Sequence, residues 1–278
     1  MIVSRLTGVL GARVDGVVLS PDMDPGLVDE LRSALVTHEV LVVPDQRLSP
    51  EEQAEFSHLL GDYSPVPFVQ PVPEHPEVIK VVKEATEPEA FNFGGVWHSD
   101  FSFLDAPPAF TILHALDVPA VGGDTVWASM TAAHDALPAE MRDLFEEVTC
   151  VHSASASYSP AQQDLHSGLS GMDIRTSESA EATRDRPLLC THPETGRRSL
   201  FLAANSTTRI VGLSEAESDL LLTFLLGHIQ LPEFHCRFRW EPHAIAFWDQ
   251  RCTVHYAIPD YKEQRTMYRL SIDGDAPH

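Results

Sequence analysis

The second half of the chain is divided into short apolar segments, and this feature limits the folds that it can adopt. The last four segments are rich in aromatic and β-branched residues and follow one another without a helical pattern between them. Such segments predict strands, and closely spaced strands without alternating helices are typical of a sandwich or jelly roll. We therefore expect a mainly β protein with flanking helices, with strands at residues 110–116, 125–127, 234–240, 244–248, 252–256 and 266–272.

Three segments carry signals for the flanking helices. Residues 25–38 place Leu27, Leu31 and Leu35 at helical spacing, and a buried strand is expected directly after them at 39–43. Residues 49–52 read Ser-Pro-Glu-Glu, which is a capping box with proline at the first helical position. Ser214 with Glu217 repeats the capping signal before a helix that is expected to reach residue 229.

The segment from 153 to 187 fits neither pattern. It is rich in Ser, Ala, Asp and Gly, lacks sustained periodicity, and is longer than the connections that are usual in a compact domain. A lid over a site and a simple surface excursion both explain it. We read residues 1–278 as a single domain in which 153–187 is an inserted lid.

Charge and composition exclude several kinds of partner. The net charge of −22 would repel nucleic acid and anionic membranes, and the apolar runs are shorter than the roughly 18 residues of a membrane span. The first residues do not resemble a signal peptide, and the four cysteines lack metal-site or disulfide spacing. We expect a cytoplasmic protein that binds a small molecule, binds neither nucleic acid nor membrane, and can form a homo-oligomer.

The strongest chemical signal is His98-Ser99-Asp100, which follows Gly94-Gly95 and leads into alternating aromatics. In an extended strand, residues two apart face the same side, so His98 and Asp100 would converge on a common point. Together with a second, distant histidine they would form the 2-His-1-carboxylate triad that binds iron and leaves coordination positions open. His-x-acid triplets also arise by chance, but those that begin at His75 and His192 contain a central proline and predict turns.

The residues alone do not single out the second histidine. His255 lies on a predicted strand that follows a polar turn, where a strand returning beside the first could carry it. Five other histidines compete with it: His58 and His228 on predicted helices, His114 and His235 on predicted strands, and His278 at the last position.

Several separated motifs resemble the taurine dioxygenase (TauD/TfdA) family of Fe(II)/2-oxoglutarate-dependent dioxygenases. The resemblance covers nearly the whole chain, and its motifs occur in the family's order. It implies a double-stranded β-helix, which is a cupin-like jelly roll, with iron held by His98, Asp100 and His255. The motifs are Trp97-His98-Ser99-Asp100, residues 122–127, Thr191-His192-Pro193 with Gly196, residues 207–211, residues 247–251, His255-Tyr256-Ala257, and Arg265 with Arg269.

The resemblance also implies the cosubstrate and the reaction. In this family 2-oxoglutarate chelates the iron, and an arginine and a threonine, here Arg265 and Thr125, hold its distal carboxylate. Its reaction with O2 releases succinate and CO2 and hydroxylates the substrate. Nine residues separate His255 from Arg265 where the family usually has ten or more, so Arg269, which would face the same side of a strand, is a possible substitute or a substrate ligand.

The same resemblance predicts a small anionic substrate other than taurine. The chain keeps the arginine that matches a sulfonate ligand, Arg269, but has no histidine or tyrosine in the loop at 64–69. Smaller residues at other matching positions leave room for a bulkier or more apolar tail. We expect substrate contacts from Phe68, Asn92, Phe101, Tyr158, Ser206 and Arg269.

Two other functions fit parts of this pattern. A cupin-like metalloenzyme could use the triad without 2-oxoglutarate, and it would not need Arg265 or Thr125. A catalytically silent protein could bind a small molecule and use the histidines as hydrogen-bonded structural groups. Iron-dependent release of succinate would separate these alternatives from a dioxygenase.

Overall fold

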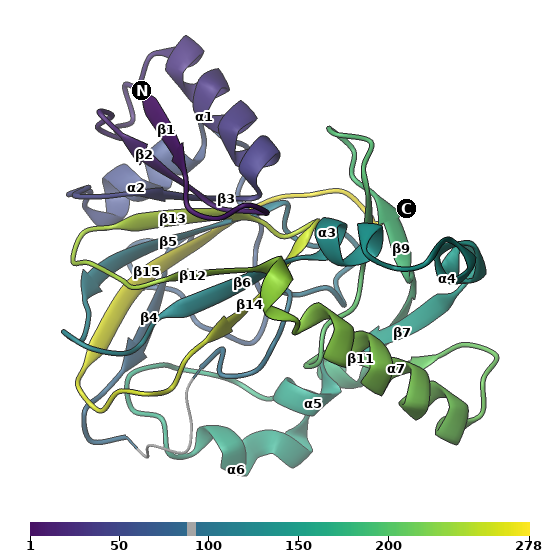
Figure 1. Cartoon of the computed structure of the whole chain (residues 1–278). Helices are drawn as coiled ribbons and strands as arrows, with labels where there is room; N and C mark the ends of the chain where they lie inside the picture. The colour runs from purple at the N-terminus through teal and green to yellow at the C-terminus, as the bar shows by residue number, and fades with distance from the viewer. Residues whose placement is uncertain (88–92) are drawn as a thin grey trace.

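The computed structural model describes residues 1–87 and 93–278, and within them two sheets face each other across a shared core (Figure 1). All pairings in the two sheets are antiparallel except the parallel pairing of β2 with β3. The larger sheet has the order β1 (Ile2–Arg5), β2 (Ala12–Asp15), β3 (Val40–Val43), β13 (Ile245–Asp249), β5 (Phe110–Asp117), β15 (Arg265–Ile272) and β4 (Ile79–Lys83). The smaller sheet has the order β12 (His235–Phe238), β6 (Thr125–Ser129) and β14 (Thr253–Ala257).

The core between the sheets explains the short strands of the sequence. β13 is buried along its whole length, and its Trp248 packs against Trp127 of β6 with ring centroids 5.7 Å apart. Met267 of β15 and Cys236 of β12 belong to the same apolar cluster. Strands that are covered on both faces have nearly continuous apolar sequences, so strict alternation is absent from them. The mainly β jelly roll with flanking helices that we predicted is confirmed.

Two helices cover the outer face of the larger sheet. α1 (Pro25–His38) and α2 (Pro50–Ser57) bury Leu31, Leu35 and Phe56 against β3, β13 and β5. At the start of α2, Ser49 accepts a hydrogen bond from the backbone of Glu52, whose side chain accepts one in return, as the capping box predicts. Glu39 caps the C-terminal end of α1, and its backbone adopts a left-handed conformation before β3 begins.

A second group of helices packs beside the smaller sheet. α7 (Glu215–Ile229) begins with the predicted capping box at Ser214. It lies against α3 (Met130–Asp135) and buries Leu225 and Ile229 in a cluster with Phe145 of α4 (Ala139–Phe145). Pro138 lies between α3 and α4 and precedes the first residue of α4.

The segment that we predicted as a lid lies between two paired strands. β7 (Thr149–Ser153) pairs with β8 (Thr183–Pro187) in continuous register, and β11 (Thr207–Ile210) pairs on the other side of β7. The end of the predicted insertion at 187 is therefore wrong in one respect, because its last five residues form β8. The remaining residues form α5 (Ser155–Tyr158), η1 (Pro160–Gln162), α6 (Gln163–His166) and η2 (Glu178–Glu181), with α5 and α6 at the bottom of Figure 1.

The remaining elements are short. β9 (Leu189–Thr191) and β10 (Arg198–Leu200) form a hairpin, and η3 (Pro232–Phe234) precedes β12. The four cysteines are all buried and free. Among the described residues, the longest apolar helix falls short of what a membrane crossing needs.

Candidate metal centre

A pair of hydrogen bonds, rather than a strand, brings the two metal-ligand candidates together. His98 forms an isolated bridge with His255 of β14: each backbone N–H donates to the other's carbonyl, at 2.9 and 2.8 Å. Asp100 then lies in a turn, and Phe101 has a positive φ of 52°. The prediction of an extended strand through Asp100 is wrong, because the chain leaves β14 directly after His98. The turn nevertheless folds Asp100 back toward the two histidines.

The three side chains form a compact, buried cluster, which we call the triad. The Nε2 atoms of His98 and His255 lie 3.7 and 3.9 Å from Oδ1 of Asp100. All three residues are buried, and the candidate ligand atoms lie within 4.8 Å of one another. A divalent ion about 2.1 Å from each ligand atom fits among atoms that are spaced in this way.

The protonation of the triad suits a cation. Burial lowers the pKa of His98, and burial together with the neighbouring His98 lowers the pKa of His255 well below the usual value. Nδ1 of His98 lies 2.7 Å from the Val96 carbonyl, so this nitrogen carries the proton and Nε2 presents its lone pair. Burial opposes the ionisation of Asp100, but the Arg269 guanidinium beside it outweighs this effect, and the pKa of Asp100 is lowered to about 2. The donor set is therefore two neutral imidazoles and one carboxylate.

The triad opens into a cavity that has a volume of about 440 Å³. Its wall combines the triad's His98 and Asp100 and the guanidinium-bearing Arg269 with aromatic and small side chains. The other lining residues are Phe93, Gly94, Gly95, Val96, Phe101, Phe103, Ala156, Ser157, Tyr158, Leu165, His166, Ala204, Asn205 and Pro259. A guanidinium beside the metal-ligand candidates, in a wall that is otherwise largely apolar, suits an organic anion with an apolar tail.

The predicted substrate residues fall into three groups. Phe101, Tyr158 and Arg269 line the cavity. Phe68 supports the wall from behind, because its ring stacks on Tyr158 at 4.9 Å. Asn92 lies outside the described residues.

We expected Ser206 to contact the substrate, but its side chain points toward Ser102 and does not line the cavity. Its hydroxyl lies 2.6 Å from that of Ser102, which is in turn 2.9 Å from Nδ1 of His152. Its neighbour Asn205 lines the cavity instead, and Oδ1 of Asn205 is buried with no hydrogen-bond partner in the described part of the chain. The Thr207-Thr208-Arg209 motif locates this loop along the chain, but a motif does not reveal which loop side chain turns inward. Sequence reasoning also missed Phe93, Phe103, Leu165 and His166 for this reason.

Arg265 and Thr125 meet on a common neighbour, Trp240. The indole N–H of Trp240 donates to the Thr125 hydroxyl at 2.9 Å, and the Arg265 guanidinium lies over the Trp240 ring at 5.9 Å from its centroid. β15 pairs with β4 in continuous register from Arg265 to Arg269, so the two arginines share one face of the strand, as predicted. Arg269 differs from Arg265 because its guanidinium already lies 3.0 Å from Oδ2 of Asp100.

Buried and incompletely paired, Arg265 has the character of an anion-binding group. Burial lowers its pKa, although Tyr261 partly offsets this effect by accepting a hydrogen bond. Its Nε and Nη2 atoms are buried, and within residues 1–87 and 93–278 neither has a hydrogen-bond partner. Arg265 faces a second cavity of about 10 Å³, and Phe93 lies in the walls of both cavities. An incoming carboxylate would satisfy the two orphaned donors.

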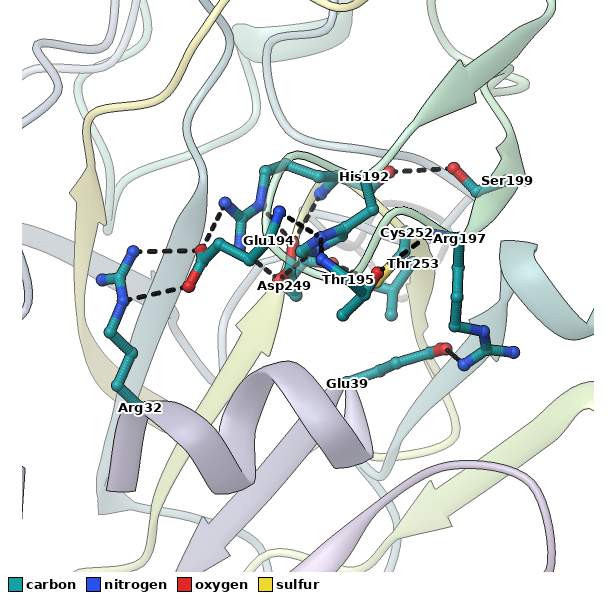
Figure 2. A network of polar contacts seen from close by, with 11 residues as sticks. Arg32, Glu39, His192, Glu194, Thr195, Arg197, Ser199, Asp249, Cys252 and Thr253 are labelled. Carbon is teal, nitrogen blue, oxygen red and sulfur yellow. Dashed lines mark hydrogen bonds and ion pairs between the residues drawn. The ribbon is translucent and has the colours of Figure 1, made fainter. Parts of the chain in front are cut away.

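A second cluster of possible metal ligands, which we call the Asp249 cluster, consists of His192, Asp249 and Cys252 (Figure 2). Nε2 of His192 donates to Oδ2 of Asp249 at 2.9 Å. Arg251 reaches both carboxylate oxygens of Asp249 with its guanidinium, and its backbone N–H also donates to Oδ1. Burial raises the pKa of the Cys252 thiol well above its usual value, so it is a poor thiolate ligand. The Asp249 cluster is therefore a closed polar network.

Comparison with known proteins agrees with this geometry. The family model described as Taurine catabolism dioxygenase TauD, TfdA family matches residues 3–271. An alpha-ketoglutarate-dependent sulfate ester dioxygenase of Pseudomonas putida is 35% identical over 99% of this chain and 90% of its own length. An alkylsulfatase of Acinetobacter baylyi is 33% identical over 98% of this chain and 84% of its own length.

The fold has the same relatives. The crystal structure of a taurine dioxygenase from Burkholderia xenovorans superimposes with a TM-score of 0.82 at 31% sequence identity. The match covers 99% of this chain and 92% of that structure. Sequence and fold thus agree over almost the full chain.

Proposed function

The chain belongs to the taurine catabolism dioxygenase TauD, TfdA family, and we propose that His98, Asp100 and His255 hold the iron of an Fe(II)/2-oxoglutarate-dependent dioxygenase reaction. When bound, iron and 2-oxoglutarate supply the O2-dependent oxidation that hydroxylates a substrate and releases succinate and CO2. The alternatives without 2-oxoglutarate lose their support, because the relatives matched over nearly the whole chain include 2-oxoglutarate-dependent enzymes.

The triad's own chemistry carries this proposal. Two neutral imidazoles and an ionised carboxylate form the set that non-haem iron prefers, and a three-residue set leaves positions free for cosubstrate and O2. The carbonyl of Val96 fixes the tautomer of His98. The ring of Trp248, 4.8 Å from that of His255, limits the space into which His255 could rotate.

Arg265 and Thr125 are assigned to the distal carboxylate of 2-oxoglutarate. The orphaned Nε and Nη2 atoms of Arg265, considered within the described residues, support this role. The Thr125 hydroxyl accepts from Trp240 and so has its own proton available to donate. Phe93 lies between the two cavities, so its position would govern how 2-oxoglutarate reaches from the triad to Arg265.

The substrate is assigned as an organic anion with an apolar tail. Arg269 is the guanidinium in the cavity wall, and Phe101, Phe103, Tyr158 and Leu165 offer apolar surface around it. The sulfate ester and alkyl sulfate chemistry named for two relatives is consistent with such a molecule. Asn205 would give the bound molecule one further polar contact.

Residues 154–182 are assigned as a lid within a single domain. They join two paired strands, so the segment can change while the β7–β8 ladder stays intact. Tyr158 and His166 bring a stacked pair of rings from this segment into the cavity wall. The net charge of −22 favours a small-molecule partner over nucleic acid or membrane, while cytoplasmic location and self-association remain predictions from the sequence.

Substrate-stimulated succinate release tests this function. Purified protein, loaded anaerobically with Fe(II), is given 2-oxoglutarate, O2 and one member of a matched series with the same alkyl chain: a sulfate ester, a sulfonate, a carboxylate or the neutral alcohol. We expect an anion to stimulate succinate release strongly and the alcohol to stimulate it weakly. Iron-independent release would contradict the reaction, whereas equal stimulation by the alcohol would contradict only the substrate assignment.

A further inference from the structure

Gln250 forms hydrogen bonds with both the backbone and the side chain of Asp100, although the two residues are 150 positions apart in the sequence. Oε1 of its carboxamide accepts from the backbone N–H of Asp100 at 3.1 Å and from the Ser99 hydroxyl at 3.3 Å. Its Nε2 donates to Oδ2 of Asp100 and, at 2.8 Å, to the Thr111 hydroxyl. One carboxamide therefore holds both the backbone and the carboxylate of a single triad residue.

The two carboxylate oxygens of Asp100 have different partners. Oδ2 accepts hydrogen bonds from Gln250 and, at 3.1 Å, from Thr111, and it forms an ion pair with Arg269 at 3.0 Å. Oδ1 instead faces the two histidine Nε2 atoms. A carboxylate has about four acceptor positions, so an oxygen with two hydrogen bonds and an ion pair has little capacity left for a metal.

We propose that Gln250 is a positioning residue that makes Asp100 a one-oxygen ligand through Oδ1. This inference rests on the proposed iron site. A carboxylate that rotated to offer both oxygens would occupy one of the coordination positions that cosubstrate and O2 need. By holding Oδ2 away from the metal, Gln250 keeps these coordination positions free, and it does so without contacting metal or substrate.

The position of Gln250 is itself fixed by the Asp249 cluster. Gln250 lies between Asp249 and Arg251, and its own N–H donates to the Ala109 carbonyl at 2.8 Å. As Figure 2 shows, Asp249 is held by His192, and the chain of ion pairs continues through Glu194 to Arg32. The closed network thus anchors the turn that presents Gln250 to the triad, which is how a supporting residue keeps a metal ligand oriented.

The test compares two buried glutamines. Gln250→Met removes the hydrogen bonds to Asp100 while keeping a side chain of similar length. Gln53→Met is the matched control, because Gln53 is also fully buried and its Oε1 lies 3.1 Å from Nδ1 of His114, in a pairing outside the triad. Metal affinity is measured with Mn(II) by electron paramagnetic resonance of the free ion, and ligand geometry by the visible absorption of the Co(II)-loaded protein.

We expect Gln250→Met to weaken Mn(II) binding by about 10–100-fold and to change the Co(II) spectrum. Gln53→Met should leave both readouts at wild-type values, even where it lowers thermal stability by the same amount. Wild-type Mn(II) affinity together with a wild-type Co(II) spectrum in Gln250→Met would overturn the inference.

Gln250→Glu is the second variant and covers the case in which Gln250→Met does not fold. It has the same size, keeps an acceptor for the Asp100 N–H, and replaces the donor to Oδ2 with an oxygen. We expect weakened Mn(II) binding and an altered Co(II) spectrum here as well, and wild-type values would overturn the inference. Wild-type protein that binds no divalent metal would instead overturn the proposed iron site, so the two failures are distinguishable.

Discussion

Two buried clusters, the triad and the Asp249 cluster, contain similar ligand types but have opposite chemical character. Each combines histidine and aspartate with a third potential ligand, and in each the ligand atoms lie within 4.8 Å of one another. They also lie close in the chain, since Asp249 precedes Gln250, which contacts Asp100. Residue type and proximity therefore do not distinguish a site from a structural network.

The difference lies in how completely each carboxylate is paired. Arg251 reaches both oxygens of Asp249, and His192 adds a further donor. Asp100 receives its donors on Oδ2, while Oδ1 faces the histidines. The Arg251 guanidinium pairs with both oxygens of Asp249, so the Asp249 cluster is part of the scaffold. Oδ1 of Asp100 and the two histidine Nε2 atoms can still offer lone pairs, so the triad is the candidate for a metal.

Replacing Asp249 with Ala is expected to have the largest effect on stability. The change leaves His192 and Arg251 without their shared partner, and breaking a buried ion pair costs about 3–5 kcal/mol. Urea denaturation measures the loss. The control is Asp135→Ala, which removes an ion pair with Arg197 in which both side chains are about half exposed, where a cost of about 0–1 kcal/mol is usual. Equal losses in the two variants would show that the Asp249 cluster is not a stabilising network.

Replacing His98, Asp100 or His255 with Ala should instead remove tight metal binding. Metal affinities of protein sites correspond to about 3–4 kcal/mol for each ligand, so each variant should lose at least two orders of magnitude in Fe(II) affinity. Anaerobic titration with Fe(II) measures this. His192→Ala serves as the comparison and should lose much less affinity than any triad variant, because His192 acts on the triad only through Asp249 and the turn that presents Gln250. If His192→Ala and the three triad variants bind iron alike, the assignment of the two clusters is reversed or wrong.

The stability of the region around the Asp249 cluster should depend on pH, because Glu39 is a buried acid beside this cluster. Burial raises its pKa from 4.5 to about 7, although Arg197 lies 3.5 Å away and opposes this shift. The folded protein thus binds the Glu39 proton more tightly than the unfolded chain, so this contribution to stability is full below pH 4.5 and is lost as pH rises to about 7. The total change is roughly 3 kcal/mol.

Glu39→Gln should abolish this decline. The measurement is the free energy of unfolding of wild type and variant at several pH values across the window. We expect the variant to gain on wild type as pH rises. A difference between the two proteins that is independent of pH would contradict the buried, protonated state of Glu39.

The smallest predicted effect concerns the two differently paired arginines. Arg265→Ala should weaken 2-oxoglutarate binding by roughly 1.5–3 kcal/mol, or about one to two orders of magnitude, because it removes a charge-assisted hydrogen bond. The charge-transfer absorbance of the anaerobic iron complex reports this affinity. Arg251→Ala should leave that affinity unchanged in the folded protein, since Asp249 and Glu194 already occupy its guanidinium. Loss of cosubstrate binding in Arg251→Ala but not in Arg265→Ala would reverse the roles.

Local sequence signals predicted much of the fold. The capping boxes at Ser49 and Ser214 and the apolar segments of β5, β13 and β15 correspond to elements within a few residues of the expected bounds. These signals succeed because capping and burial of a strand depend on residues that are close in the chain. The strand predicted through Asp100 failed, since its turn depends on a bridge to His255 in a distant segment.

The sequence by itself determined which residue types were available: the His98 and Asp100 pair, a later histidine, two arginines on one strand, and an overall acidic composition. Only the tertiary structure decided which of these groups remain chemically open. It paired Asp249 with Arg251 and placed Gln250 against Asp100. It also directed Ser206 toward Ser102 and placed Asn205 in the cavity wall. The reason is that hydrogen-bond saturation depends on contacts between segments far apart in the chain, which periodicity and spacing do not encode.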